Sequence, residues 1–298
     1  MTTDSPDILA RVDASDQIAE LRKFHRPELL HKDFDHAAVA DFLHERDIEY
    51  SQDMLIVISE EDRDRLYGVK APAFFHPLTG MIFLVPSDSP LNDEGNVVHE
   101  AGHKSGRQDI WVKRLTDEKD ANPRYTVSEE STGIMVRHTL PFENTTGVFL
   151  EEGYVKFLQY EYLLRRVHSE SAIGGASFTQ FARSFAYLTE VYDQLHEEGE
   201  FMQVFLAARQ TNEGFNAFRD KLQKAFSETF FDMLMVACSS YSDSDDDYEE
   251  YILVSQMNDI MTYLRKIKYG KKEEAEDFAR LALMEFLKGR SSNEAEDT

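Results

Sequence analysis

Cysteine, cationic residues and long apolar runs are all scarce in this chain of 298 residues. Its one cysteine, Cys238, excludes an internal disulfide framework and any zinc cluster built from cysteines. Lys and Arg number 32 against 56 Asp and Glu, which gives a formal net charge of −24. Because binding to nucleic acid or to an anionic membrane depends largely on clustered cations, we expect neither as a partner.

The chain has no run of about 18 apolar residues, so no membrane-spanning helix is expected. Its first segment, MTTDSPDILARVDASD, lacks a basic region followed by an apolar stretch and does not resemble a secretory signal. We therefore expect a cytoplasmic protein. Hydrophobic residues make up 42% of the sequence, which suffices for a sizeable core.

The apolar pattern of the first half is mixed. Helical spacing behind an Asp cap predicts a helix over about 34–48, and runs rich in β-branched and aromatic residues predict strands at 55–58, 73–75 and 81–85. A loop over 87–95 is expected to lead into a helix over about 96–105, which Gly106 should end. Further on, 125–128 and 134–138 flank a turn and predict a hairpin.

The second half is helical in pattern. The expected helices cover about 147–167, 178–198, 200–211, 213–237, 249–268 and 271–288. We therefore predict an α+β fold, in which a small, twisted, mainly antiparallel sheet and a motif helix precede an all-helical subdomain. The expected divisions are a partly flexible N-terminal extension (1–30), an α+β subdomain (31–145), a helical subdomain (146–290) and a disordered tail (291–298).

One short motif predicts a metal site. His99-Glu100-Ala-Gly-His103 places two imidazoles four residues apart, on the same face of a helix, where both can bind one zinc ion. Glu100 lies one step round the helix and is placed to accept a proton from a water molecule beside the metal. The spacing thus supplies two metal ligands and a general base within five residues. The alternative is a helix with two surface histidines and no metal.

A catalytic zinc site usually has three protein ligands, so a third is needed. One candidate is Glu152, at the start of a predicted helix that also carries Glu151; paired carboxylates there also fit a plain interaction with the helix dipole. The other candidate is Asp109, three residues after Gly106, which fits the pattern of a glycine turn followed by a third ligand. That class also needs a methionine turn, and Met135 lies in a strand-like run, which favours Glu152.

The His99-Glu100-Ala-Gly-His103 motif, followed by Phe149-Leu-Glu-Glu152-Gly-Tyr-Val, resembles the gluzincin zinc metallopeptidases and is especially similar to their small members, the minigluzincins. In that class the third ligand is a Glu on a downstream helix, commonly followed by Gly, which selects Glu152 over Glu151. Two departures are Lys104, where an uncharged residue is usual, and Lys156, where thermolysin-like members place an acid.

The resemblance implies a zinc-dependent peptidase with one zinc ion per chain, held by His99, His103 and Glu152, with Glu100 as the general base and a peptide or protein as substrate. It also implies that the strand before the motif helix, 81–85, is an exposed edge that pairs with the substrate backbone; the alternative for this segment is an ordinary core strand. The alternatives are a catalytically silent relative that binds zinc or a peptide, and a metzincin-like peptidase with Asp109 as third ligand.

Overall fold

The computed structural model describes residues 14–67, 71–77, 79–114, 125–138, 144–167, 176–238 and 247–296. Its backbone contacts divide the chain into two compact units, Met1–Lys104 and Ser105–Thr298. This division falls earlier than the expected boundary at 145/146, because the strands after Ser105 contact helices of the second unit. Most described residues are helical and both units also contain strands, so the fold class is α+β, as predicted.

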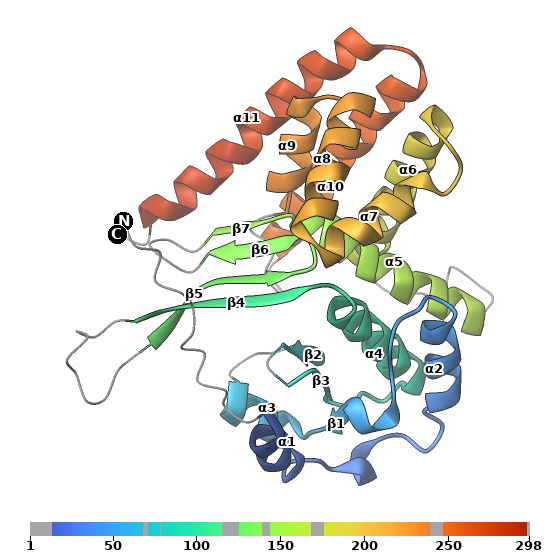
Figure 1. Cartoon of the computed structure of the whole chain (residues 1–298), viewed down its shortest axis with the longest axis vertical. Helices are drawn as coiled ribbons and strands as arrows, with labels where there is room; N and C mark the ends of the chain where they lie inside the picture. Colours follow the sequence, from blue (N-terminus) through green and yellow to red (C-terminus); the bar gives the residue numbers. More distant parts are fainter. Residues whose placement is uncertain are drawn as a thin grey trace. The chain divides into compact units, whose positions relative to one another are not determined.

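The first unit contains a small sheet and four α-helices in its described part (Figure 1). Its elements are α1 (Ala14–Arg22), η1 (Pro27–Leu29), α2 (His36–His44), η2 (Gln52–Met54), β1 (Leu55–Val57), α3 (Glu60–Tyr67), β2 (Ala73–His76), β3 (Met81–Leu84) and α4 (Pro90–Lys104). The predicted Asp cap is confirmed, because the Asp35 side chain accepts a hydrogen bond from the Ala38 amide at 3.0 Å. The three predicted strands are confirmed as β1, β2 and β3.

Strand β3 lies in the centre of this sheet, whose order is β1-β3-β2. It pairs in parallel with β1, where Ile56 faces Phe83, and antiparallel with β2, where Phe74 faces Phe83. The prediction that 81–85 is an exposed substrate-binding edge is therefore wrong. The physical reason is visible in the composition: all four residues of β3 are apolar and buried, which is typical of a strand covered on both faces.

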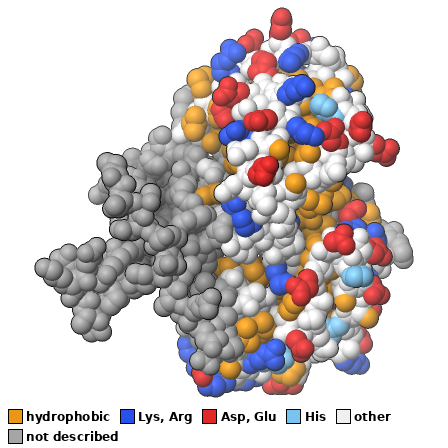
Figure 2. Space-filling model, viewed as in Figure 1, with side chains coloured by type: hydrophobic (Ala, Val, Ile, Leu, Met, Phe, Trp, Pro, Cys, Tyr) orange, Lys and Arg blue, Asp and Glu red, His pale blue; other side chains and the backbone are white. Residues whose placement is uncertain are grey.

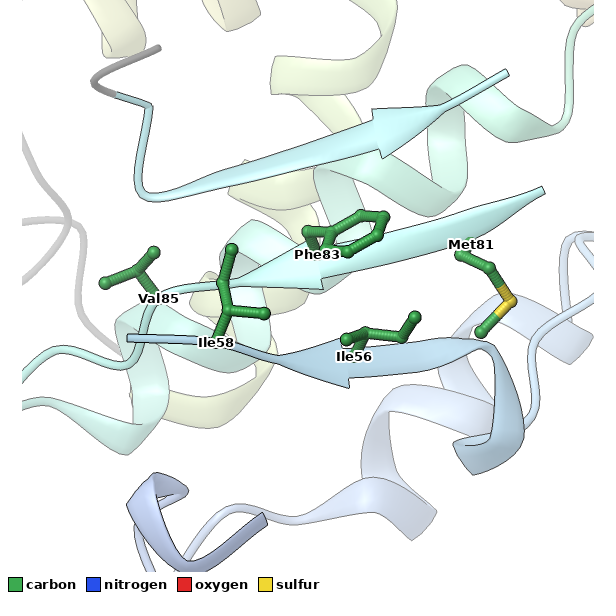
Figure 3. Close-up of a cluster of buried hydrophobic side chains, with 5 residues drawn as sticks. All are labelled: Ile56, Ile58, Met81, Phe83 and Val85. Carbon is green, nitrogen blue, oxygen red and sulfur yellow. The ribbon is translucent and has the colours of Figure 1, made fainter. Parts of the chain in front are cut away.

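A cluster of buried hydrophobic side chains lies on one face of β1 and β3 (Figure 3). Its buried members are Ile56, Ile58, Met81, Phe83 and Val85. Ile18 and Leu21 of α1 pack against this cluster, so part of the expected N-terminal extension belongs to the folded core. Helix α4 contacts β2 and β3 and buries Val97, Val98 and Ala101 completely. The sheet thus provides the support on which the motif helix is fixed.

Helix α4 begins at Pro90, six residues before the predicted start, so the expected loop over 87–95 is helical from Pro90 onward. Proline is favoured at the first helical position, and Ser89 precedes it: its hydroxyl accepts from the Asn92 amide at 3.3 Å. The Asn, Asp and Gly residues of this segment favour a loop, which is why the predicted start was too late. The local signal for the true start is the pair Ser89-Pro90, a capping residue followed by a first-turn proline.

The second unit begins with a four-stranded sheet and continues with helices. Its elements are β4 (Gln108–Arg114), β5 (Tyr125–Thr132), β6 (Met135–His138), β7 (Asn144–Thr146), α5 (Val148–Val167), α6 (Ala176–Leu195), α7 (Glu200–Gln210), α8 (Asn212–Ala225), α9 (Glu228–Val236), α10 (Asp247–Lys268) and α11 (Lys272–Glu296). From Val148 onward, the described secondary structure consists of helices alone, as predicted. Helix α11 includes most of the expected tail, 291–298.

The four strands run antiparallel in the order β4-β5-β6-β7. The predicted hairpin is confirmed as β5 and β6, with Thr132 opposite Met135 and the turn at Gly133, which has a φ of +58°. Asp109, the alternative third-ligand candidate, lies in β4, with Ser131 as its partner across the ladder. The chain thus enters a strand soon after Gly106.

The predicted helix over 213–237 is two helices, α8 and α9, separated at Phe226 and Ser227. The Ser227 hydroxyl accepts from the Phe230 amide at 3.1 Å and so caps α9. Apolar periodicity continues through the break, because Phe218, Phe226 and Phe230 are all buried in the same aromatic core. Periodicity alone therefore could not reveal the division.

Replacing Ser227 by Ala should destabilise the protein by about 1 kcal/mol, because the first turn of α9 loses its side-chain acceptor. For a unit of this size, the melting temperature should fall by about 2–4 °C. Ser227→Asn is the control: the amide oxygen can cap as well as the hydroxyl, so stability should stay near that of the wild type. Thermal unfolding followed by circular dichroism measures both, and equal loss in the two variants would contradict the capping role.

Among the described helices, none combines the length and the apolar character needed to cross a bilayer. On the face seen in Figure 2, the described Lys and Arg side chains are interspersed with Asp and Glu. The acidic excess of the sequence is thus mixed with cations on this face.

Candidate metal centre

The two predicted imidazole ligands meet on helix α4. The Nε2 atoms of His99 and His103 are 3.2 Å apart, and the two rings are tilted by 77°. Two nitrogens bound to one tetrahedral zinc ion at 2.0–2.1 Å would be about 3.3–3.4 Å apart. The i, i+4 spacing has therefore placed both donor atoms at the separation that a shared zinc ion requires.

Without metal, the same contact is a hydrogen bond between two imidazoles, in which the tautomers decide which nitrogen donates. Two protonated rings at this distance would repel each other. The repulsion would be strong because the site is partly buried and so poorly screened by water. His103 is only 8% exposed. Neutral imidazole is the form in which histidine binds metals.

Glu100 follows His99 on α4 and is half-buried. Consecutive helical residues point about 100° apart, so its side chain leaves α4 from the row next to that of the His pair. Ala101 and Gly102, between Glu100 and His103, are buried toward the body of the unit. Small residues on that side let the helix pack closely, while His99 and Glu100 stay half-buried and His103 is buried.

Two buried carboxylates that the sequence reasoning missed fix α4 in place. Asp93 is fully buried and accepts from the Ser87 amide and hydroxyl, at 3.0 and 2.8 Å. Burial raises the pKa of Asp93, and the Ser87 hydrogen bonds partly oppose this shift. Glu94 accepts from the Asp35 amide at 2.8 Å, at the start of α2. Their signal in the sequence is acidic residues in the first turn after Ser89-Pro90.

Lys104 was a departure from the family pattern, and its charge is balanced locally. Its Nζ lies 3.1 Å from a carboxylate oxygen of Glu49 and 3.4 Å from the Glu49 carbonyl oxygen. Both residues belong to the first unit. The cation that follows His103 is therefore drawn to Glu49 and does not rule out a metal at the histidines.

In the second unit, the consecutive acids Glu151 and Glu152 of α5 have different surroundings. Both oxygens of Glu151 accept from the Arg209 guanidinium, at 3.0 and 2.5 Å, and Oε2 also accepts from the Ile134 amide at 3.2 Å. Glu151 is fully buried and Arg209 is 1% exposed. Burial lowers and the Glu151 charge raises the pKa of Arg209, and the net shift is upward. Glu151 is thus committed to a structural ion pair.

Glu152 is 7% exposed and forms an ion pair with Lys156, at 3.7 Å between Nζ and Oε2. The next residue, Gly153, packs against Phe185 of α6, where a Cβ would lie 3.1 Å from the Phe185 Cβ. The Glu-Gly pair of the motif therefore reflects close packing of α5 on α6. Of the two acids, Glu151 is the one held in a bidentate arginine pair.

Two further side chains near α5 were not found from the sequence alone. Burial, with a smaller contribution from the Glu152 charge, raises the pKa of the Cys238 thiol, so this cysteine stays protonated. Arg209 occupies a row of α7 that otherwise buries Phe205 and Phe201, four and eight residues earlier. A cation in an apolar row is the signal that could have identified it.

The structure thus brings His99, Glu100 and His103 together on α4 in the first unit and places Glu152 on α5 in the second. Asp109 lies in strand β4. Comparison with known protein families, curated proteins and solved structures gives no match to this chain. The functional assignment therefore depends on the residues of the site themselves.

Proposed function

We propose that the chain is a zinc-dependent metallopeptidase of the gluzincin type, in which His99, His103 and Glu152 hold one zinc ion and Glu100 is the general base. The observation that carries this proposal is the 3.2 Å separation of the two Nε2 atoms on α4, which suits two vertices of a tetrahedral zinc site. The position of Glu100 between the two ligands adds the base that hydrolysis needs.

The donor set supports the choice of zinc. His99, His103 and Glu152 each offer one ligand atom, two nitrogens and one carboxylate oxygen. Two histidines and one glutamate are the protein ligands of a well-known class of catalytic zinc sites, which leave one position open. When bound, the ion polarises a carbonyl group and lowers the pKa of a water molecule to about 7.

Glu152 is favoured over the other two acids considered. Glu151 is already held by Arg209 through both of its oxygens. Asp109 lies within strand β4, whereas the metzincin-like alternative expects its third ligand just after a glycine turn. Ligation by Glu152 would exchange its ion pair with Lys156 for a bond to the metal.

In this proposal, Glu100 and the two histidines have separate roles. The Glu100 carboxylate accepts the proton of the water molecule that attacks the peptide carbonyl, and returns it to the leaving amine nitrogen. His99 and His103 would hold the ion through their Nε2 atoms, which lie 3.2 Å apart. The substrate is a peptide or an unfolded protein segment, since the reaction joins water to an amide carbon.

A zinc titration and a cleavage assay on the full chain test this function together. The expected result is one zinc ion per chain and cleavage of a denatured protein or peptide library that stops with a chelator and returns with zinc. Zinc binding without any cleavage would instead support the silent relative that binds zinc or a peptide. Failure to bind zinc would contradict both proposals.

A further inference from the structure

Arg209 is the most completely buried cation among the described residues, and its contacts lie within the second unit. Its Nε and Nη2 donate to the two oxygens of Glu151, and its Nη1 donates to the Ser105 hydroxyl at 2.8 Å. The guanidinium carbon lies 4.4 Å from the centre of the Tyr154 ring. Arg209 thus binds α5 and the Ser105 side chain at the same time.

The backbone around Arg209 strengthens the same connection. The Arg107 amide donates to the Arg209 carbonyl oxygen at 2.7 Å, and the Gln210 side-chain amide donates to the Ser105 carbonyl oxygen at 2.5 Å. Ser105 directly follows Lys104, the last residue of α4. The end of α7 is therefore fastened to the three residues through which the chain leaves the motif helix.

The carboxylate of Glu151 has no freedom to move in this arrangement. A Cβ on Gly133 would lie 2.2 Å from its Oε2, and Gly133 has a φ of +58°, so only glycine fits there. The Ile134 amide donates to the same oxygen at 3.2 Å. A bidentate arginine–carboxylate pair closed in by backbone fixes direction as well as distance.

We infer that Arg209 is a positioning residue for the metal centre: by holding Glu151, it fixes the rotation of α5 about its axis and so the direction of the neighbouring Glu152 carboxylate. This rests on the proposed function, in which Glu152 binds zinc. Consecutive helical residues are separated by about 100°, so a fixed Glu151 leaves Glu152 one direction. A buried ion pair adds little stability over apolar packing, but it can specify one geometry.

Two variants separate positioning from folding. Arg209→Lys keeps the charge but loses the planar fork that binds both oxygens of Glu151. The double variant Arg209→Met/Glu151→Leu removes both charges, so no buried charge is left without its partner. Arg219→Lys is the matched control, because Arg219 lies on the exposed side of α8 and pairs with Asp220.

The readouts are the zinc dissociation constant, the visible absorption spectrum with Co²⁺ in place of Zn²⁺, and the melting temperature without metal. We expect the double variant to unfold within a few degrees of the wild type, to bind zinc about 10–100-fold more weakly and to show an altered cobalt spectrum. Arg209→Lys should bind zinc more weakly as well, while Arg219→Lys should match the wild type in all three.

Wild-type zinc affinity and cobalt spectrum in both Arg209 variants would overturn this inference and leave the proposed function intact. Failure of both variants to fold would also overturn it, because Arg209 would then serve folding alone. If the wild-type chain binds no zinc, the proposed function itself fails, and the inference fails with it.

Discussion

Replacing Glu100 by Gln is expected to lower peptide turnover by about 10²–10⁴-fold while the zinc ion stays bound. The amide has nearly the shape of the carboxylate but cannot accept the proton of the attacking water. His99 and His103 are unchanged in this variant, and their 3.2 Å separation on α4 should persist. The measurement is turnover at saturating peptide together with the zinc content of the same preparation.

Glu60→Gln is the control for this substitution, because Glu60 is an exposed acid in the first turn of α3. It removes the same charge from the first unit and should leave both turnover and zinc unchanged. Equal loss of zinc and activity in Glu100→Gln would contradict the assignment and make Glu100 a structural residue of the helix.

Replacing Glu152 by Gln should weaken zinc binding by more than about 100-fold. Substituting a residue that only hydrogen-bonds to a ligand lowers metal affinity about 10–100-fold, and the loss of a charged ligand should lower it further. The melting temperature without metal should change little, since glutamine keeps the size and shape of the side chain and the ion pair with Lys156 is long, at 3.7 Å. A zinc titration and a thermal unfolding curve measure the two effects separately.

Two neighbouring acids give the matched comparisons. Asp109→Asn should leave zinc affinity unchanged, because Asp109 lies in β4 and is not proposed as a ligand. Glu151→Gln should instead destabilise the protein, by about 3–5 kcal/mol, because the buried Arg209 loses its charged partner. Zinc retained by Glu152→Gln and lost by Asp109→Asn would overturn the gluzincin assignment in favour of the metzincin-like one.

The sequence predicted well the features that depend on residues close together in the chain. The i, i+4 spacing of His99 and His103 determines that their rings share a helix face, whatever the rest of the fold does. The Asp35 cap and the hairpin at Gly133 are likewise local. Such features need only helix geometry, capping chemistry or a residue that tolerates positive φ.

Features that depend on distant residues were predicted less well. The place of β3 in the middle of its sheet depends on pairing with β1, and the local clue was that its apolar residues are continuous and do not alternate. The different roles of Glu151 and Glu152 depend on Arg209, 58 residues after Glu151. Only the resemblance selected Glu152 over Glu151. The structure shows that both oxygens of Glu151 are bound by Arg209.

The central claim is that two imidazoles and one carboxylate of this chain bind a single zinc ion. X-ray absorption at the zinc edge, on the full-length chain loaded with one equivalent of zinc, tests it most directly. The account predicts two imidazole ligands and additional oxygen at about 2.0–2.2 Å, with no sulfur. A sulfur ligand at about 2.3 Å, or fewer than two imidazoles, would contradict it.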